Sequence, residues 1–324
     1  MNEPQNLRIS EPQNLRTSEP QNLRTSEPQN LRTSEPQNLR TSEPHGNSNI
    51  DLDVVEHFGN EWRSFDNGKR PQEDLEREFN GYFSIFPWDK LPENAVGFDA
   101  GCGNGRWAKF VLQNKKVGLL NCIEPSCALE VAKKKLSNFK NVRFFQSSID
   151  DMPIEINSQD FGYCLGVLHH IPDTLSAMRK CTDKLKPGAP FLVYMYYNFE
   201  NRPLWFKWIW KCSDVLRHVI CRLPHSIKIL ITNVIATCIY YPLAKIAYLA
   251  KKLHLPYKNI PLSAYRCASF YDMRNGALDR FGTCLEKRYS KAEIVDLMQK
   301  SHLENISFSD NPDVNWCAVG YKKA

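Results

Sequence analysis

The sequence predicts an α/β protein in which helices cover both faces of a parallel sheet. The main observation is the regular alternation of short apolar runs with helical segments after residue 92. A second is a glycine-rich loop directly after the first apolar run, and a third is the return of the alternation near the C-terminus. The predicted strands occupy residues 95–100, 117–123, 142–146, 161–165, 191–196, 305–309 and 316–321. A chain of 324 residues with 42% hydrophobic and 24% charged residues excludes collagen-like, disulfide-dense and wholly disordered proteins.

The first feature along the chain is a repeat. Residues 3–42 hold five copies of an eight-residue unit, the last four of which read EPQNLRTS. Each copy contains a proline and a single leucine, so the repeat can build neither an apolar helix face nor a packed pair of strands. We therefore predict that residues 1–49 form a disordered tail, with a partner-binding array as the alternative.

Residues 50–92 are predicted to form a helical, aromatic cap on the following domain. Their apolar residues recur at helical spacing on either side of a turn at Asn67-Gly68 and Pro71. They are Val54, Val55, Phe58, Trp62, Phe65, Leu75, Phe79, Tyr82 and Phe83. The domain under this cap would comprise residues 93–199 and 283–324.

The loop after the first strand carries the strongest chemical signal. It places Asp99 before three glycines, Gly101, Gly103 and Gly105. Glycines at this spacing permit a tight turn in which backbone N–H groups of the loop and of the next helix face a ligand. A nicotinamide dinucleotide fingerprint would have its third glycine where Arg106 stands. An acid before the loop would also repel a pyrophosphate and attract an ammonium or sulfonium group.

The ends of the next strands add further polar positions. Glu124 ends the second strand roughly twenty residues beyond the glycines, where an acid can accept hydrogen bonds from ribose hydroxyls. The third strand is followed by SSIDDMP at residues 147–153, and the fourth ends in LGVLHH at residues 165–170. With these motifs in this order, the sequence resembles the class I S-adenosylmethionine-dependent methyltransferases, above all the small-molecule branch that includes quinone-biosynthesis enzymes.

The resemblance covers residues 54–197 and 290–321 and implies both a fold and a cofactor. The implied fold is a Rossmann-like, doubly wound sheet of seven strands in the order 3-2-1-4-5-7-6. Its last pair contains the antiparallel strand, and a helical insertion follows strand five. The implied cofactor is S-adenosyl-L-methionine. By this resemblance Asp99 and the glycine loop hold its methionine end, Glu124 its ribose and Ile149 and Asp150 its adenine, while Leu165 and Gly166 line it beneath the methyl group.

Each of these positions also has a purely structural explanation. The glycines could serve only the strand-to-helix turn, Asp150 could be a turn or cap residue beside Asp151, and Asp160 is expected to serve a turn. His169 and His170 are candidate catalytic residues, because an imidazole near the acceptor could remove a hydroxyl proton before methyl transfer. The alternative is that they only pack and shape the pocket, since alignment of the reactants can supply much of the rate. No metal site is expected.

Residues 200–282 are predicted to be a helical, lid-like insertion. Residues 204–220 place their apolar side chains on one stripe, and a second apolar segment, 227–253, has lysines near both ends. Residues 200–258 hold ten Lys and Arg against two acids, a net charge of +8, whereas the rest of the chain sums to −2. Such helices either pack as a lid or lie in a membrane interface, so residues 202–258 could dock to an anionic membrane.

The candidate substrate residues follow these apolar helices. They are Tyr265, Arg266, Tyr271 and Arg274. Arginines among tyrosines near a pocket could bind a carboxylate or phosphate of the substrate. The alternative is that Arg266, Arg274 and Arg280 pair with Asp272 and Asp279 and only support the scaffold.

The cellular setting is predicted from cysteines and hydropathy. The eleven cysteines show neither a C-x-x-C pair nor zinc-site spacing, which favours a reducing cytosol and buried thiols. The start of the sequence shows no signal-peptide pattern. The longest uncharged apolar stretch, 229–244, is shorter than the ~18 residues that suggest a spanning helix. We therefore expect a cytoplasmic protein, with peripheral contact at the inner membrane face as a further expectation.

The predicted function is S-adenosylmethionine-dependent O- or C-methylation of a small, hydrophobic or lipid-linked acceptor. The sequence has no Asn/Asp-Pro-Pro-aromatic motif after strand four and no Pro-Cys dipeptide. Their absence disfavours amino-group methylation of nucleic acids and the covalent cysteine route to a pyrimidine carbon. The alternatives are a catalytically silent S-adenosylmethionine-binding module and an RNA methyltransferase, although nucleic acid is not the expected partner.

Overall fold

The computed structural model describes residues 49–65, 68, 70–200, 202–311 and 316–324. The octapeptide repeat and the predicted disorder of residues 1–49 lie outside the described residues, apart from Asn49. Asn49 itself donates a hydrogen bond from Nδ2 to the backbone oxygen of Asp173, at 2.8 Å.

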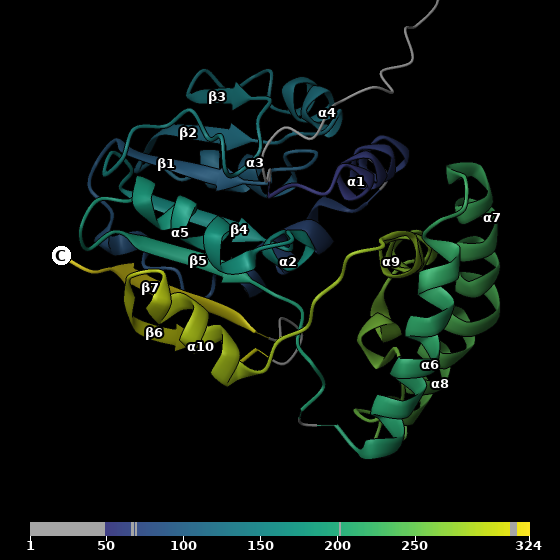
Figure 1. Ribbon diagram of the computed structural model, residues 1–324. Coiled ribbons are helices and arrows are strands. Elements are labelled where there is room, and N and C mark those ends of the chain that lie inside the picture. The colour runs from purple at the N-terminus through teal and green to yellow at the C-terminus, as the bar shows by residue number, and fades with distance from the viewer. Residues whose placement is uncertain (1–48, 66–67, 69, 201, 312–315) are drawn as a thin grey trace, which may run out of the picture. The chain divides into compact units, whose positions relative to one another are not determined.

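The described part of the chain is built on one seven-stranded sheet in the order β3-β2-β1-β4-β5-β7-β6 (Figure 1). The first five strands are parallel, and β7 runs antiparallel to both β5 and β6. The order implied by the sequence resemblance is therefore confirmed. The strands are β1 (Ala95–Ala100), β2 (Val117–Ile123), β3 (Val142–Phe145), β4 (Phe161–Leu165), β5 (Pro190–Tyr194), β6 (Leu303–Phe308) and β7 (Cys317–Lys322).

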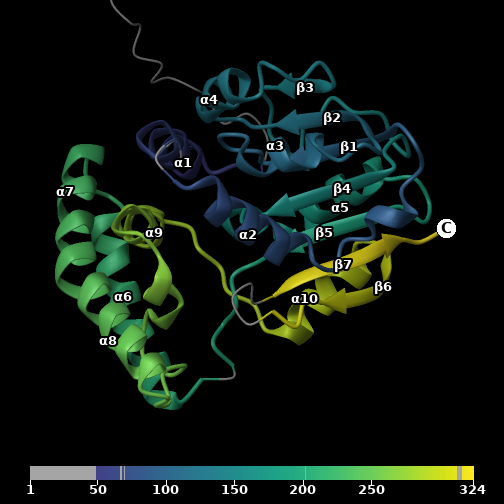
Figure 2. The same ribbon diagram turned by 180° about the vertical axis from the view of Figure 1, so that it is seen from behind.

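Helices cover both faces of this sheet, as the alternating sequence pattern predicts. On one face α2 (Gln72–Phe83), α3 (Arg106–Leu112) and α4 (Ala128–Lys135) contribute to an apolar cluster with Phe161 and Tyr163. On the other face α5 (Thr174–Lys184) and α10 (Lys291–Lys300) pack with Phe98 and Cys164. Adjacent strand residues such as Tyr163 and Cys164 point to opposite faces, which is why each buried strand reads as a continuous apolar run. Figures 1 and 2 show the two faces.

The aromatic cap divides into two parts. In α2 and the short turn η1 (Trp88–Lys90), the rings of Phe79, Phe83 and Trp88 stack on one another and on the sheet cluster. The other part, α1 (Leu52–Ser64), begins at Asp51, whose carboxylate accepts a hydrogen bond from the Val54 N–H. Helix α1 contacts α4 of the sheet domain and α9 (Phe270–Gly282) of the insertion.

The insertion after β5 is helical, as predicted. It consists of α6 (Leu204–Ile220), α7 (His225–Ile235), the π-helical turn η3 (Ala236–Tyr240), α8 (Tyr241–Lys252), the short turn η4 (Ser263–Cys267) and α9. In Figures 1 and 2, α9 lies between the sheet and the layer formed by α6, α7 and α8. The core of the insertion consists of residues of α6, α7, α8 and α9, including Ile220, Ile235, Ala244 and Phe281.

The expectation that no segment reaches membrane-spanning length is wrong. Residues His225–Lys252 form one helix of 28 residues that could cross a membrane by length and composition alone. The helix passes Pro242, which lacks the N–H needed for an α-helical hydrogen bond, because the wider π-helical turn immediately precedes it. Sequence reasoning made the segment too short because it counted only uncharged residues and therefore stopped at Lys228 and Lys245.

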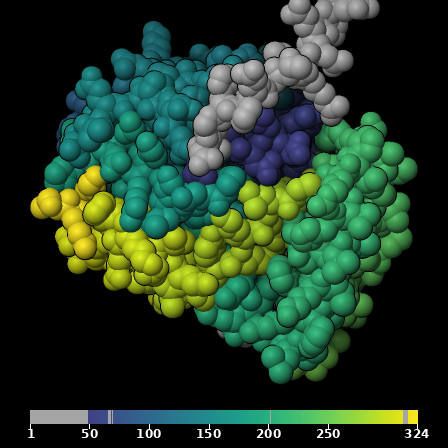
Figure 3. Space-filling model, viewed as in Figure 1, coloured from purple at the N-terminus to yellow at the C-terminus, as the bar shows by residue number. Residues whose placement is uncertain are grey.

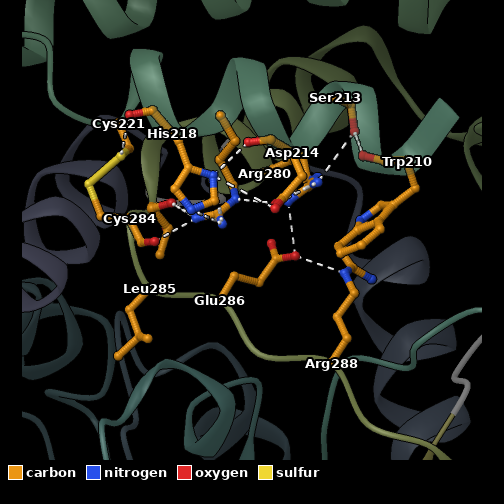
Figure 4. A network of polar contacts seen from close by, with 12 residues as sticks. Trp210, Ser213, Asp214, His218, Cys221, Arg280, Cys284, Leu285, Glu286 and Arg288 are labelled. Carbon is orange, nitrogen blue, oxygen red and sulfur yellow. Dashed lines mark hydrogen bonds and ion pairs between the residues drawn. A yellow bond between two sulfur atoms is a disulfide. The ribbon is translucent and has the colours of Figure 1, made fainter. Parts of the chain in front are cut away.

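A polar network joins α6 to α9 and to the segment that leads back to the sheet (Figure 4). The buried Arg217 side chain pairs with Asp214 at 2.8 Å and donates to the backbone oxygens of Thr283 and Cys284. Arg280 pairs with both Asp214 and Glu286, and Arg288 also pairs with Glu286. These contacts make Arg280 a scaffold residue, one of the two roles that the sequence left open.

A disulfide lies in the same region, whereas the cysteine pattern predicted reduced, buried thiols. Cys221 at the end of α6 is bonded to Cys284, 63 positions later (Figure 4). Of the nine free cysteines, Cys127, Cys212, Cys238 and Cys267 are exposed, so the expectation of buried thiols holds for five. The disulfide was missed because the two cysteines come together only when α6 packs beside α9.

Candidate active site

The main candidate site is a pocket at the carboxyl ends of β1, β2 and β4. Its cavity volume is about 140 Å³. The glycine loop, Glu124, Ile149 and the Leu165-Gly166 turn form part of its wall. Helix α1 supplies another part through Val54, Val55, Phe58 and Trp62. Ligands of open α/β sheets bind at this edge, because the strand order reverses there and leaves a crevice.

The glycine loop has a backbone conformation that would be strained in a residue with a side chain. Gly101, Gly103 and Gly105 adopt φ values of +80°, +52° and +71°, all in the left-handed region. A Cβ at Gly101 would lie 2.5 Å from Cγ2 of Val167, so even alanine does not fit without movement. Gly101 and Gly103 line the pocket, whereas Gly105 is the N-cap of α3 beneath the loop. The loop therefore serves both the turn and the pocket wall.

Glu124 connects the loop to the second strand. One carboxylate oxygen accepts a hydrogen bond from the Gly103 N–H at 2.9 Å, and the other accepts from the Ser126 N–H at 2.9 Å. The side chain is buried but lines the pocket. Because a carboxylate oxygen has more than one acceptor position, Glu124 can still accept hydrogen bonds from a ligand.

Asp99 lies behind the pocket wall and does not line it. Asp99 is 3% exposed. Burial raises the pKa of its carboxyl to about 8, although the nearby Tyr163 hydroxyl acts to lower this pKa. Burial of Asp99 therefore favours the protonated form of its carboxyl at neutral pH. Direct attraction of a sulfonium group by this residue stays a prediction, since the structure brings Asp99 to the loop but not to the pocket surface.

The segment after β3 separates its two acids. Ile149 lines the pocket and its neighbour Ser148 does too, whereas Asp150 and Asp151 do not. Asp151 accepts a hydrogen bond from the Ser148 hydroxyl at 3.0 Å, which is a local turn contact. Asp150 has a buried carboxylate oxygen without a hydrogen-bond partner among the described residues. This orphaned acceptor favours Asp150 over Asp151 as a ligand-binding residue.

The two histidines have different surroundings. His170 lines the pocket and packs against Phe58 with ring centroids 4.8 Å apart. His169 does not line the pocket, and its ring packs on Tyr196 at 3.9 Å. Both are buried, and burial lowers the pKa of each imidazole. The sequence treated the pair as equivalent, but the structure brings only His170 to the pocket.

The tautomer of His170 is fixed by its backbone partner. Its Nδ1 lies 2.7 Å from the Leu285 carbonyl oxygen, which can only accept, so Nδ1 carries the proton. In the neutral ring Nε2 then holds a lone pair, and this atom is buried with no hydrogen-bond partner among the described residues. A neutral imidazole with an available Nε2 lone pair can accept a proton from a bound acceptor.

Buried acids lie behind this histidine. Asp279 of α9 accepts a hydrogen bond from the Tyr196 hydroxyl at 2.6 Å, and its charge opposes the lowering of the His170 pKa. Glu61 of α1 lies 3.4 Å from the His57 imidazole, and both side chains are at most 2% exposed. Burial raises the pKa of both Glu61 and Asp279. The insertion therefore contributes a carboxyl group to the surroundings of a pocket histidine.

The candidate substrate residues are not brought to this pocket. Tyr265 packs on Tyr240 inside the insertion, and the Arg266 guanidinium lies over the Tyr257 ring. Tyr271 packs on Phe65, while Arg274 donates to the Asn233 side chain at 2.7 Å. Their predicted role in substrate binding stays a prediction, and the contacts they make here are those of a scaffold.

Sequence reasoning missed several residues of the pocket wall. Arg106 lines it and lies 4.1 Å from the Trp107 ring centroid and 5.2 Å from that of Trp62. The sequence marked Arg106 only as a departure from a dinucleotide motif, and Trp62 only as part of a cap. No local signal shows that Phe58 and Trp62 face the pocket, because α1 is brought there by packing against α4 and α9. Within the described ranges, no group of three or more His, Cys, Asp or Glu side chains could hold a metal ion.

Comparisons with known proteins identify the domain that carries this pocket. A family model described as a methyltransferase domain matches residues 98–193. The ubiquinone biosynthesis O-methyltransferase of Vibrio vulnificus (strain YJ016) is 33% identical over 156 residues, which are 44% of this chain and 63% of that protein. The enzyme of the same name from Erwinia tasmaniensis is 28% identical over 167 residues, 48% of this chain and 66% of that protein. The chain thus spans just under two thirds of these relatives.

Two further similarities extend this result. The tRNA (carboxymethyluridine(34)-5-O)-methyltransferase ALKBH8 of Macaca fascicularis is 25% identical over 135 residues, 37% of this chain and 19% of that protein. A solved complex between the Haloferax volcanii Trm112 methyltransferase activator and a methyltransferase is similar with a TM-score of 0.50 and 12% identity, covering 83% of this chain and 99% of that chain. This last similarity shows the fold alone. The family match over residues 98–193 and the bacterial relatives show that the chain contains a class I S-adenosylmethionine-dependent methyltransferase domain, and the sheet order agrees with it.

Proposed function

We propose that this protein transfers the methyl group of S-adenosylmethionine to a small, hydrophobic or lipid-linked acceptor, with a hydroxyl oxygen as the favoured acceptor atom. The observation that carries the proposal is the shared pocket wall. The glycine loop and Glu124 lie in the same wall as His170, whose Nε2 lone pair has no partner among the described residues. This shared wall supports the proposal, because groups suited to the cofactor and a candidate base line one space.

The residues present fit the cofactor on three structural grounds. The close approach of Gly101 to Val167 leaves no room for a side chain, so the loop backbone itself borders the pocket. Glu124 is held by two backbone N–H groups in a position suited to ribose hydroxyls. The unpartnered oxygen of Asp150 beside Ile149 suits the amino group of an adenine. Leu165 and Gly166 complete this part of the wall.

When bound, S-adenosylmethionine supplies an electrophilic methyl group. His170 then serves as the base: its Nε2 takes the proton of the acceptor hydroxyl, while Nδ1 keeps its hydrogen bond to Leu285. A lowered pKa keeps this imidazole neutral at physiological pH, so the base form is present before the acceptor binds. Asp279 is a positioning residue that stabilises the imidazolium through its charge.

The pocket wall also favours an apolar acceptor. Val54, Val55, Phe58 and Ile171 supply hydrocarbon and aromatic surface next to His170. The bacterial relatives named as ubiquinone biosynthesis O-methyltransferases support a hydroxyl as the acceptor group, because their names specify methylation at oxygen. An acceptor with an aromatic or prenyl-bearing hydroxyl would match this surface.

The two alternatives make different predictions. A silent binding module would bind the cofactor without transferring its methyl group. An RNA methyltransferase, a class represented among the relatives by a tRNA-modifying enzyme, would need basic surface for phosphates. The basic residues of this chain concentrate in the insertion, where they alternate with exposed apolar side chains instead of forming a purely polar groove.

The test has two stages. Calorimetry first measures binding of S-adenosylmethionine to the wild type and to Glu124→Ala, which should bind at least tenfold more weakly because it loses ribose contacts. The wild type is then incubated with methyl-labelled cofactor and a cell extract that is separated into lipid, aqueous small-molecule and RNA fractions. Label in the lipid or small-molecule fraction is expected. Label confined to RNA, or tight binding with no label in any fraction, would contradict the proposal.

A further inference from the structure

The exposed apolar surface of this protein is concentrated in one place. Among the described residues, twenty large apolar side chains are exposed, and eighteen of them belong to residues 204–270. The two others are Leu52 and Ile156. A soluble surface usually carries such side chains singly, whereas a concentrated patch marks an interaction surface. Figure 3 shows α6, α7 and α8 in green as a continuous surface on one side of the described part of the molecule.

Helix α6 carries one half of this surface as a stripe along its whole length. The exposed members come mostly as adjacent pairs that recur at helical spacing, so they lie on one side of the helix. They are Leu204, Trp205, Trp208, Ile209, Val215, Leu216 and Val219. The opposite side carries Arg217, Ile220 and Cys221, which are buried and bind or pack towards α9 and residue 284. The apolar stripe therefore faces away from α9.

The helix formed by α7, η3 and α8 repeats this arrangement. Its exposed apolar residues include Ile227, Leu230, Val234, Tyr241, Tyr248 and Leu249. Its buried residues, among them Ile235, Tyr240 and Ala244, form the insertion core with Met273, Ala277 and Phe281 of α9. Both helices thus bury one side against α9 and leave an apolar side uncovered by any described residue.

Basic side chains accompany the apolar ones. The Lys211 amine lies 5.5 Å from the Trp208 ring centroid, and the Lys245 amine lies 5.3 Å from that of Tyr241. Lys251 and Lys252 are exposed at the end of α8. Within 200–258 the net charge is +8, while the remainder of the chain is slightly acidic. Aromatic rings that reach the headgroup level beside lysines are typical of a helix in the interface of an anionic bilayer.

We propose that the exposed faces of α6 and α7–α8 dock into the interface of an anionic lipid bilayer, with both helices lying along the membrane plane. Charge complementarity selects this occupant, because the exposed rings of Trp208 and Tyr241 each have a lysine beside them that would face anionic headgroups. This proposal does not depend on the acceptor or on methyl transfer.

The inner faces of the helices argue against a spanning arrangement. The Lys228 amine donates to the Gly282 carbonyl oxygen at 3.2 Å, and the Asn233 side chain accepts from Arg274 at 2.7 Å. In a spanning helix these polar groups would lose their partners and enter hydrocarbon, which is costly. Lying in the plane leaves these contacts intact and buries only the outer faces.

The experiment measures partitioning of the full chain onto vesicles by flotation. Vesicles of phosphatidylcholine alone are compared with vesicles that also contain phosphatidylglycerol. The test variant is Val215→Glu/Leu230→Glu, and the matched control is Ile156→Glu, since Ile156 is 68% exposed and Val215 and Leu230 are 70% and 65% exposed. Circular dichroism and cofactor binding verify that every variant is folded.

A second pair of variants tests the charge contribution. Lys251→Gln/Lys252→Gln should weaken binding to the anionic vesicles roughly 30-fold, about fivefold for each charge. Lys115→Gln/Lys140→Gln removes two exposed charges from the sheet domain and should leave binding unchanged. The Val215→Glu/Leu230→Glu variant should bind at least tenfold more weakly, because two carboxylates would enter the apolar interface.

Three results would overturn the proposal. The first is equal partitioning of the wild type and the Val215→Glu/Leu230→Glu variant. The second is a wild-type dimer in solution that the same variant abolishes, with no vesicle binding, since a second copy would then cover the surface. The third is wild-type protein that stays with the vesicles after an alkaline carbonate wash, because this resistance indicates a spanning helix. None of these results depends on methyl transfer, so they are distinguishable from failure of the proposed function.

Discussion

The tight contact at Gly101 gives a sharp test of how the cofactor loop is held. In Gly101→Ala, the new Cβ would lie 2.5 Å from Cγ2 and 2.9 Å from Cγ1 of Val167, inside the 3.4 Å at which ordinary contact begins. The residue would also have to keep φ near +80°. Two separate costs therefore add: a left-handed backbone for a residue with a side chain, and a clash that Val167 must relieve.

A matched glycine separates these two costs. Gly188 has nearly the same φ, +78°, but a Cβ there would meet nothing within 4 Å. Gly188→Ala should thus lower the free energy of unfolding by the backbone cost alone, about 1–2 kcal/mol. Gly101→Ala should lose that amount plus ~1–3 kcal/mol for overpacking against Val167. The difference between the two variants isolates the clash.

The assays are urea unfolding, followed by tryptophan fluorescence, and calorimetric titration with S-adenosylmethionine. Gly101→Ala should weaken cofactor binding about tenfold or more, because the loop backbone must shift away from Val167, whereas Gly188→Ala should not change it. A double-mutant cycle with Val167→Ala should recover the clash contribution and leave the backbone cost. If Gly101→Ala loses no more stability than Gly188→Ala, the reasoning that this contact fixes the loop is refuted.

Three other predictions concern the acid–base groups and the disulfide. His170→Ala should lower label transfer about 10²–10⁴-fold and leave cofactor affinity unchanged, whereas an equal loss of transfer in His169→Ala would contradict this assignment. Wild-type activity should persist as pH falls below 6.5, because burial lowers the pKa of His170. Burial raises the pKa of Asp99 from 3.8 to about 8, so between these values the folded state holds a proton that the unfolded chain has lost, and the free energy of unfolding falls as pH rises. Asp99→Asn should flatten this dependence in urea unfolding between pH 5 and 9, and an unchanged slope would assign it to other groups. Cys221→Ser should lower the free energy of unfolding of the full chain by about 2–4 kcal/mol under oxidising conditions but have little effect in reductant, a difference that thermal melts can detect.

The sheet and much of the cofactor site were predictable because their signals are local. The central strands β1, β4 and β5 are mostly apolar and buried on both faces, and the Gly101 and Gly103 loop follows β1 directly. Parallel strands bring their carboxyl ends to one edge, so Glu124 and Ile149 reach the same pocket without any information on side-chain packing.

The surroundings of the acceptor space could not be predicted in this way. His169 and His170 are adjacent in the sequence, and only the turn after β4 decides that one faces the pocket and the other packs on Tyr196. The placement of Asp279 near His170 depends on α9 folding back from the insertion. The spacing of residues in the sequence does not show that α9 packs near His170.

The sequence by itself determined the strand order through its family pattern, the glycine loop and the basic, apolar character of the insertion. These features depend on neighbouring residues or on composition, so they can be recognised in the amino-acid sequence alone. Only the tertiary structure decided that α1 forms a wall of the pocket, that Cys221 meets Cys284, and that α6 and α7–α8 leave their apolar faces uncovered. Such contacts join residues far apart in the chain, and packing against α9 selects which side of each helix is buried.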